Sequence, residues 1–332
     1  MTLDPTKLTL FLEKTTKSNR IVIISHMNAD GDAMGSSLGL WHLLGQKPTL
    51  ILPNGCPHQF EWMPGSANIL SGDTQRERCE KALFDSDLII GVDFNTLNRV
   101  DFLSTALGQS KAYKFLIDHH HSPQIEAFDT VISVPELSSA SELVYWIANG
   151  SYGDAAINQD AARCLYTGIC TDTGSFSYSC EQPSLYQAAA ALVSKNIDAA
   201  GIHNNIFNTY SVERMQFWGF ALSERLKIFD HFAYFSISLE DQRRFGIGPA
   251  DMEGLVNYTL MMEQVEVGAL LREEEHRVKV SLRSKHDIDV NIIAREHFNG
   301  GGHTKASGGH TTISLEQTCQ MLEDIFLPIT KM

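Results

Sequence analysis

The chain has 332 residues, of which 43% are hydrophobic and 20% charged, so it has the composition of a folded globular protein and more residues than one hydrophobic core usually takes. Its formal net charge of −14 excludes a general coat for duplex DNA, because non-specific phosphate binding requires a surplus of Lys and Arg. No apolar run approaches the ~20 residues of a membrane span, and the N-terminus lacks the features of a secretory signal, so we expect a cytoplasmic protein. The six cysteines form no C-x-x-C pair, and we expect them to be free thiols.

The first half of the chain alternates short β-branched segments with helical ones. Strands are expected at 21–25, 49–53, 87–93, 114–118 and 130–134. This alternation is typical of a parallel sheet with flanking helices, which makes the fold class α/β. From about Ser138 the apolar residues follow helical spacing, and we expect these helices to flank the sheet.

The second half changes its order of elements. Residues 196–228 predict a polar turn and one long amphipathic helix, SVERMQFWGFALSERLKIF, which would link two domains. Beyond it come a strand HFAYFSISL, a helical DMEGLVNYTLMMEQ, a hairpin VEVGALLREEEHRVKVSLRSK and a final helix SLEQTCQMLEDIF. We therefore expect a first domain at 1–195, a helical linker at 196–228 and a smaller α/β domain at 229–332.

Acidic and histidine side chains follow the predicted strands, at the edge where open α/β sheets place their active sites. His26, Asp30 and Asp32 follow the first strand in a loop that Gly31 allows to turn sharply. For this segment alone, a capped helix start and metal binding are about equally good explanations. Asp93 ends a buried strand and by itself favours a polar strand end over a ligand.

Consecutive histidines follow a later strand, in the segment Asp118-His119-His120-His121. Imidazoles are poor core formers, so this segment favours function over packing. Asp172, at the end of a helical run, is an ordinary turn residue when taken alone. Together the four segments supply carboxylate oxygens and imidazole nitrogens, a set that suits Mn²⁺ or Mg²⁺ and differs from a thiolate zinc site.

Four ordered motifs, SHMNADGDAMGS, GVDF, IDHH and TDTG, resemble those of the DHH phosphoesterase superfamily. Further along, SLRS, DVNIIA and NGGGHTKASGG resemble the DHHA1 domain that accompanies it, and the resemblance runs from about residue 15 to 325. The two-domain layout is similar to the nanoRNase and pAp-phosphatase subfamily, whose members are often labelled exopolyphosphatase-related.

The resemblance implies a site with two Mn²⁺ ions, for which Mg²⁺ or Co²⁺ could substitute. It implies that His26 and Asp30 bind one ion, that Asp32, His119 and Asp172 bind the other, and that Asp93 bridges them. His120 would then face the scissile phosphate as a catalytic residue, and the role of His121 stays open.

The glycine-rich segment of the second domain could contact the far end of a substrate. Gly300, Gly301 and Gly302 form either a flexible turn or a backbone cradle for phosphate, and five glycines in ten residues favour the cradle. Arg283 could bind a phosphate through its planar guanidinium, and His303 could bond a phosphate or stack on a base. Arg99 is either a further phosphate contact or a solvated arginine at a helix start.

These expectations combine into a phosphoesterase that hydrolyses very short oligoribonucleotides to mononucleotides, with 3′-phosphatase activity on 3′-phosphoadenosine 5′-phosphate (pAp) included. The chain has no long basic track, which disfavours long or duplex nucleic acid. Three alternatives stay open: a cyclic or linear di-adenylate phosphodiesterase, an exopolyphosphatase or pyrophosphatase, and a non-catalytic RNA-binding protein. The sequence also leaves the oligomeric state open, a homodimer included.

Overall fold

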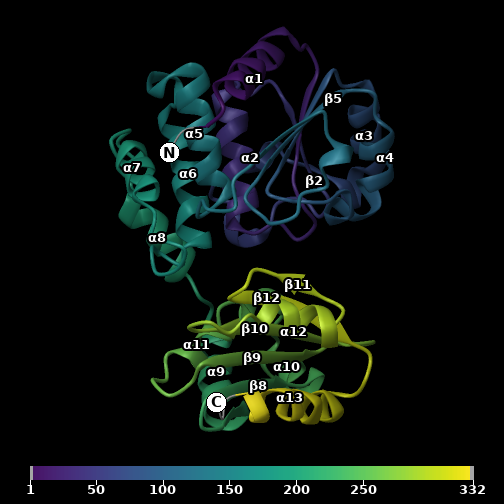
Figure 1. Ribbon diagram of the computed structural model, residues 1–332, viewed down its shortest axis with the longest axis vertical. Helices are drawn as coiled ribbons and strands as arrows, with labels where there is room; N and C mark the ends of the chain where they lie inside the picture. Colours follow the sequence, from purple (N-terminus) through teal and green to yellow (C-terminus); the bar gives the residue numbers. More distant parts are fainter. Residues whose placement is uncertain (1–2, 330–332) are drawn as a thin grey trace. The chain divides into compact units, whose positions relative to one another are not determined.

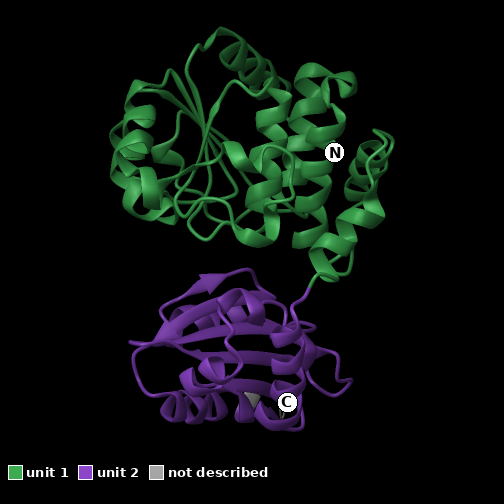
Figure 2. Ribbon diagram, turned by 180° about the vertical axis from the view of Figure 1, so that it is seen from behind, with its two compact units in different colours: residues 1–209 green, residues 210–332 purple. Residues whose placement is uncertain are grey.

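The computed structural model of the protein describes residues 3–329. The chain divides into two compact units, with the division between Thr209 and Tyr210 (Figure 2). Over residues 3–329, none of the helices combines the length and the apolar character that crossing a membrane requires.

Unit 1 is built on a parallel sheet of six strands in the order β3-β2-β1-β4-β5-β6. The strands are β1 (Ile21–Ile24), β2 (Thr49–Leu52), β3 (Leu70–Ser71), β4 (Leu88–Val92), β5 (Tyr113–Asp118) and β6 (Thr130–Ser133). The chain builds outward from β1 to β3, then returns to place β4 on the other side of β1. In such sheets a ligand crevice opens at the carboxyl ends of the two strands where the order reverses, here β1 and β4.

Helices cover both faces of this sheet, which is why its central strands, β1 and β4, are apolar throughout. One face carries α1 (Pro5–Lys17), α2 (Gly31–Leu43), α5 (Ala140–Tyr152) and α6 (Gln159–Asp172), and the other carries α3 (Gly72–Asp85) and α4 (Ser104–Gln109) (Figure 1). Ile21 and Ile23 of β1 pack toward the first set, and Val22 and Ile24 toward the second. Two further helices, α7 (Pro183–Val193) and α8 (Ala199–Phe207), pack against α6.

A row of glycines lets α2 and α6 pack backbone to backbone. Gly31, Gly35 and Gly39 recur every four residues and so share one face of α2. A Cβ atom at Gly35 would lie 2.6 Å from the carbonyl oxygen of Cys164, and one at Gly39 would lie 2.5 Å from a methyl carbon of Leu165. The close approach brings the C-terminal end of α6 beside the N-terminal end of α2.

Unit 2 is a second six-stranded sheet in the order β11-β12-β10-β9-β8-β7, in which β8 and β9 are parallel and the other neighbours antiparallel. The strands are β7 (Leu226–Ile228), β8 (Phe232–Ile237), β9 (Val267–Glu273), β10 (Val278–Ser284), β11 (Gly301–Gly302) and β12 (Ala306–Thr311). Its helices are α9 (Val212–Phe220), α10 (Leu239–Phe245), α11 (Asn257–Leu260), α12 (Val290–His297) and α13 (Leu315–Ile329). Residues of α12 and α13 pack on one face of the sheet, and residues of α9 pack on the other.

The segment expected to be one helical linker differs in the structure. Helix α9 ends at Phe220, a π-helical turn follows at Ala221–Arg225, and Leu226–Ile228 form the edge strand β7. Pairing of β7 with β8 prevails over the local helical pattern, which is a weak preference. Residues 209 and 210, where the units divide, lie in no helix.

The helix expected over DMEGLVNYTLMMEQ is also broken. The structure has a 3₁₀ turn at Pro249–Met252 and the four-residue α11. Gly254 separates them with a φ of 87°, a left-handed conformation that ends a helical run and that glycine adopts at little cost.

Candidate active site

The loop after β1 carries the first candidate residues, His26 and Asp30. Asp30 caps α2, because its Oδ1 accepts the backbone N–H groups of Asp32 and Ala33 at 3.0 Å each. His26 is buried, and its Nε2 lies 3.4 Å from Oδ2 of Asp93 and 3.9 Å from Oδ1 of Asp30. The carboxylate of Asp30 therefore caps α2 and also lies beside His26, in a position where it could bind a metal ion.

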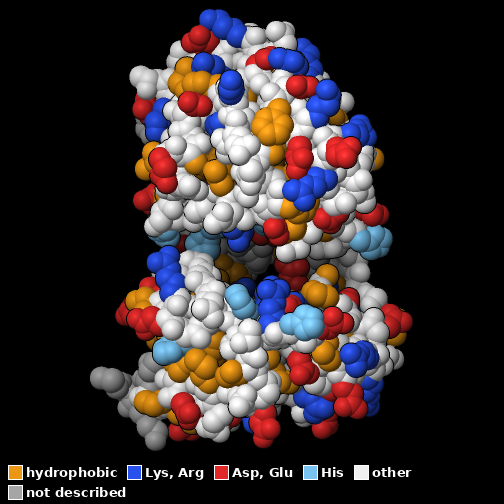
Figure 3. Space-filling model, turned by 90° about the vertical axis from the view of Figure 1, so that its right-hand side faces the viewer, with side chains coloured by type: hydrophobic (Ala, Val, Ile, Leu, Met, Phe, Trp, Pro, Cys, Tyr) orange, Lys and Arg blue, Asp and Glu red, His pale blue; other side chains and the backbone are white. Residues whose placement is uncertain are grey.

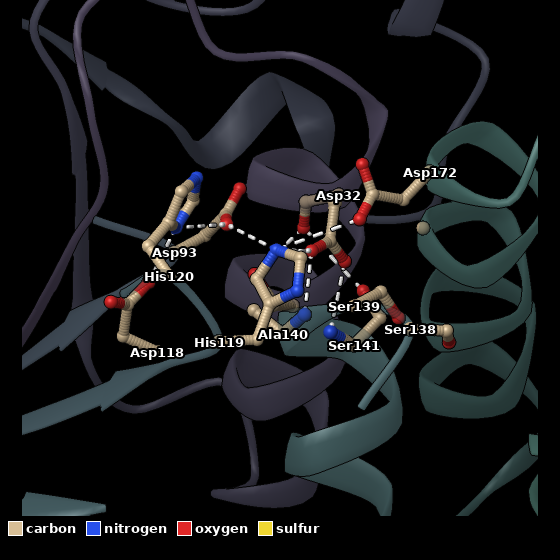
Figure 4. Close-up of polar contacts among 12 residues, drawn as sticks. Asp32, Asp93, Asp118, His119, His120, Ser138, Ser139, Ala140, Ser141 and Asp172 are labelled. Atoms are coloured by element: carbon tan, nitrogen blue, oxygen red, sulfur yellow. Dashed lines mark hydrogen bonds and ion pairs between the residues drawn. The ribbon is translucent and has the colours of Figure 1, made fainter. Parts of the chain in front are cut away.

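Asp32 lies inside α2 and reaches the N-terminus of another helix, α5. Its Oδ2 accepts the N–H of Ala140 at 2.6 Å, and its Oδ1 accepts that of Ser141 at 2.8 Å (Figure 4). The positive end of a helix stabilises a carboxylate. Burial nevertheless raises the pKa of Asp32, although His119 and the bonds from Ser141 act to lower it.

Asp93 follows β4 in a left-handed backbone conformation. Its φ is 61°, a region that aspartate adopts more readily than most non-glycine residues, and its N–H donates to the carbonyl of Ile117 at 3.0 Å. The residue is 2% exposed, and among the described residues Oδ1 has no hydrogen-bond partner. Burial and then the neighbouring carboxylates, Asp32 foremost, raise the pKa of Asp93 well above its usual value. Ring nitrogens of His26, His119 and His120 lie 3.4, 3.6 and 3.8 Å from its oxygens, beyond hydrogen-bond distance for Oδ1, and a cation between these groups would give the buried carboxylate a direct positive partner.

The two histidines after β5 point in different directions. His119 is buried, and its Nε2 lies 3.8 Å from Oδ2 of Asp32, 3.6 Å from Oδ1 of Asp93 and 3.5 Å from Oδ2 of Asp172. His120 is 24% exposed at its side chain, and its Nδ1 lies 2.7 Å from Oδ1 of Asp118 (Figure 4). A carboxylate can only accept at this distance, so Nδ1 of His120 carries a proton and Asp118 fixes the orientation of the ring.

Asp172, the last residue of α6, completes the cluster from a distant part of the chain. Its Oδ2 faces His119, and its side chain is 33% exposed. Burial, then the charges of Asp32 and Asp30, raise the pKa of Asp172 well above its usual value. The glycine contact between α2 and α6 is what brings this carboxylate to the others.

The donor atoms form three groups that share Asp93. The first is His26, Asp30 and Asp93, the second is Asp32, Asp93 and His119, and the third is Asp93, Asp118 and His120; within each group the candidate donor atoms lie within 4.8 Å of one another. Asp172 adjoins the second group through His119. Carboxylate oxygens with imidazole nitrogens suit hard or intermediate divalent cations, so the residues fit a pair of metal ions.

Arg99 and His121 lie at the margin of this cluster. Arg99 is exposed in the 3₁₀ segment Leu97–Leu103, and its carbonyl accepts the N–H of Met27 at 2.7 Å. Burial lowers the pKa of His26, Asp30 opposes this, and the charge of Arg99 lowers it further. His121 is exposed, and its carbonyl accepts a bond from the side chain of Asn95.

In unit 2, Arg283 lies on β10 between Gly268 of β9 and Ala306 of β12. Its side chain is half-buried, and its Nη1 donates to the carbonyl of Leu282 at 3.0 Å. Arg283 therefore lies on a strand that is paired on both sides, which fixes the position of its backbone.

The glycine run is not the loose loop or open cradle that was expected. Gly301 and Gly302 form β11, which pairs with β12, and a Cβ at Gly300 would lie 1.9 Å from the carbonyl oxygen of Gly308. The amides of Gly300, Gly302 and His303 donate to Ala294, Asn291 and Ala306 respectively. The glycines thus allow close strand packing, and these three amides serve that packing and not a phosphate.

Comparison with known proteins agrees with this architecture. The N-terminal domain of the DHH family matches residues 20–169, and the DHHA1 domain matches residues 231–326. The chain belongs to the DHH family of phosphoesterases. Among DHH-type structures, it is similar to an exopolyphosphatase-related protein from Bacteroides fragilis, with 36% identity, 99% coverage of each chain and a TM-score of 0.94.

Two curated relatives are named bifunctional oligoribonuclease and PAP phosphatase. The one from Bacillus subtilis is 26% identical over 312 residues, which cover 92% of this chain and 93% of the relative. The one from Mycoplasma pneumoniae is 26% identical over 313 residues, with 91% and 92% coverage.

The structure of this DHH-family chain also reveals contacts that the sequence did not. Asp118 was not among the predicted site residues, although its place at the end of an apolar strand is a position where a buried carboxylate needs a partner. The N-terminus of α5, which binds Asp32, carries no motif and lies 108 residues further along the chain.

Proposed function

We propose that this DHH-family phosphoesterase uses two Mn²⁺ ions to hydrolyse very short oligoribonucleotides to mononucleotides, and pAp to AMP, in the cytoplasm. The observation that carries the proposal is that the groups His26, Asp30, Asp93 and Asp32, Asp93, His119 share the buried Asp93. Full-length similarity to proteins named oligoribonuclease and PAP phosphatase supports the substrate class.

His26, Asp30 and Asp93 would hold one ion, and Asp32, His119, Asp172 and Asp93 the other. When bound, two such ions lower the pKa of a water and neutralise charge on the phosphate. Asp93 is suited to the shared position because it is buried and surrounded by carboxylates, which leaves it in need of positive charge from both sides.

His120 and Asp118 would handle the proton of the leaving oxygen. Asp118 orients the ring by accepting the Nδ1–H; in the doubly protonated ring, Nε2–H could then pass its proton to that oxygen or donate a hydrogen bond to a phosphate oxygen. His120 is partly exposed, as a group that meets substrate must be, whereas His119 is buried among the candidate ligands.

The DHHA1 domain would bind the part of the substrate away from the cleaved bond. Arg283 can bind a phosphate through two parallel N–H bonds, and His303 can bond a phosphate or a base. The acidic chain offers no long cationic track, which favours substrates of a few nucleotides. The β11–β12 edge would be shaped by Gly300, Gly301 and Gly302. In the DHH domain, Arg99 would add a cation beside the metal site. The enzyme would act as a monomer or homodimer.

A substrate panel tests the proposal. Purified protein with Mn²⁺ is incubated with pAp, the dinucleotide pApA, a 5-mer RNA, a 24-mer RNA, cyclic di-AMP and polyphosphate, and the products are separated by chromatography. We expect turnover of pAp, pApA and the 5-mer, and little of the 24-mer. Preferred turnover of cyclic di-AMP or polyphosphate would replace the proposed substrate class, and no turnover with Mn²⁺, Mg²⁺ or Co²⁺ would favour a binding protein.

Two variants test the assigned residues. Asp93→Ala should abolish turnover and weaken binding of both ions in calorimetric titration, whereas loss of one ion alone would contradict the shared position. His120→Ala should retain metal binding and lower kcat ~10²–10⁴-fold. Asp85→Ala and His58→Ala are matched controls, because both side chains are exposed on unit 1 and neither belongs to a candidate donor group.

A further inference from the structure

The turn that follows Asp172 has an unusual backbone. Gly174, Ser175 and Phe176 are successively left-handed, with φ of 52°, 59° and 61°. This conformation costs each non-glycine residue ~1–2 kcal/mol, so surrounding contacts must hold it in place. Backbone strain of this kind concentrates at functional sites.

A buried threonine and a histidine hold the turn. The carbonyl oxygen of Thr173 accepts hydrogen bonds from the N–H groups of Ser177 at 2.8 Å and Tyr178 at 2.9 Å. The hydroxyl oxygen of Thr173 accepts a further hydrogen bond from the N–H group of Phe176 at 2.9 Å. From α8, Nδ1 of His203 lies 3.2 Å from the hydroxyl oxygen of Ser175. The turn is therefore ordered by several bonds next to a candidate metal ligand.

The turn places the ring of Tyr178 beside Gly174. A Cβ at Gly174 would lie 2.8 Å from Cδ2 and 2.9 Å from Cε2 of that ring, so the ring takes up space that a side chain at position 174 would fill. The side chain remains 49% exposed. Because its N–H is bonded to Thr173, the residue directly after Asp172, the ring is anchored beside the C-terminal end of α6.

We propose that the exposed side of Tyr178 stacks on a base of the nucleotide substrate. The inference rests on the proposed function, since it concerns how a nucleotide is held when its phosphate lies near Asp172. Metal ions and cationic side chains bind any phosphate, whereas a flat ring binds only a substrate that carries a base. Every base has a π-face, so Tyr178 distinguishes nucleotides from polyphosphate without selecting among bases.

Binding and turnover together test this inference with the Mn²⁺-loaded protein. Affinities for AMP and for ribose 5-phosphate, which lacks the base, are measured by calorimetry for wild type, Tyr178→Ala and Tyr178→Phe. Loss of stacking should weaken AMP binding about tenfold in Tyr178→Ala, leave ribose 5-phosphate binding unchanged, and spare Tyr178→Phe. Phe84→Ala on α3, a ring that is 50% exposed on the other face of the sheet, is the matched control and should bind both ligands as wild type does.

Turnover adds a second measurement. For pApA, Tyr178→Ala should raise KM about tenfold with little change in kcat, and the increase should vanish for one of two pApA analogues that each lack one base. An equal loss of affinity for AMP and ribose 5-phosphate, or no loss for either, would overturn the stacking role. Failure of wild type to turn over any nucleotide would instead overturn the proposed function, and the AMP comparison would still decide whether Tyr178 binds a base.

Discussion

Replacing Gly35 by alanine should separate α2 from α6 and thereby damage the candidate metal site. The new Cβ would lie 2.6 Å from the carbonyl oxygen of Cys164 and 2.7 Å from the amide nitrogen of Gly168, both backbone atoms that cannot rotate away. Ordinary contacts begin at 3.4 Å, so the helices must move apart by about 0.8 Å, an overpacking that costs ~1–3 kcal/mol. Calorimetry should show a fall in Tm of ~2–4 °C for each kcal/mol.

The same shift should reduce activity, because α2 carries Asp32 and α6 carries Asp172. A displacement of about 1 Å can cost ~100-fold in rate, so kcat/KM should fall by about that factor. Gly108→Ala in α4 is the control: its Cβ would meet Leu97 at 3.4 Å, and an alanine in a helix adds ~0.5–1 kcal/mol of stability. A Gly35→Ala protein with wild-type Tm and activity would show that the glycine contact does not position Asp172.

Three other variants separate the roles assigned above. Asp118→Asn should keep metal affinity but lower kcat ~10²-fold or more, because His120 loses the carboxylate that orients it; unchanged kcat would refute that role. Asp93→Asn should abolish turnover yet raise the Tm measured in EDTA, since an unpartnered buried carboxylate oxygen costs ~1–3 kcal/mol; a lower Tm in EDTA would contradict this. Gly300→Ala should loosen the β11–β12 edge, because its Cβ would lie 1.9 Å from the Gly308 carbonyl oxygen; hydrogen exchange at 301–308 as slow as in wild type would count against it.

The five longer strands of unit 1 could be predicted within about a residue at each end, because helices bury both faces of the sheet and the strand segments are mainly apolar. The two-residue strands β3 and β11 were missed, since so short a segment has no periodicity to detect, and the six-residue β12 was missed because its sequence ASGGHT contains two glycines, which are depleted in strands. Strand β7 was predicted as helix, because its pairing with β8 depends on contacts that the local pattern does not contain.

In the candidate site, too, the residues within motifs could be predicted, whereas contacts between segments distant in the sequence could not. Motifs drew attention to the segments that contain His26, Asp93 and His119, and the reversal of strand order between β1 and β4 explains why such segments meet. The bonds from the start of α5 to Asp32 could not be predicted, because they join residues 108 and 109 positions apart through the packing of two helices.

The surroundings of the carboxylates indicate where positive charge is most needed. Asp30 accepts two amides of α2 and lies near His26, and these interactions, against the effect of burial, lower its pKa. Asp32 accepts two amides of α5. Asp93 has a left-handed backbone and an oxygen that no described donor satisfies, and burial and then the neighbouring carboxylates raise its pKa. The fold thus supplies helix amides to Asp30 and Asp32, whereas Asp93 faces the imidazoles of His26, His119 and His120 with Oδ1 unbonded, which is the arrangement expected if two cations meet at Asp93.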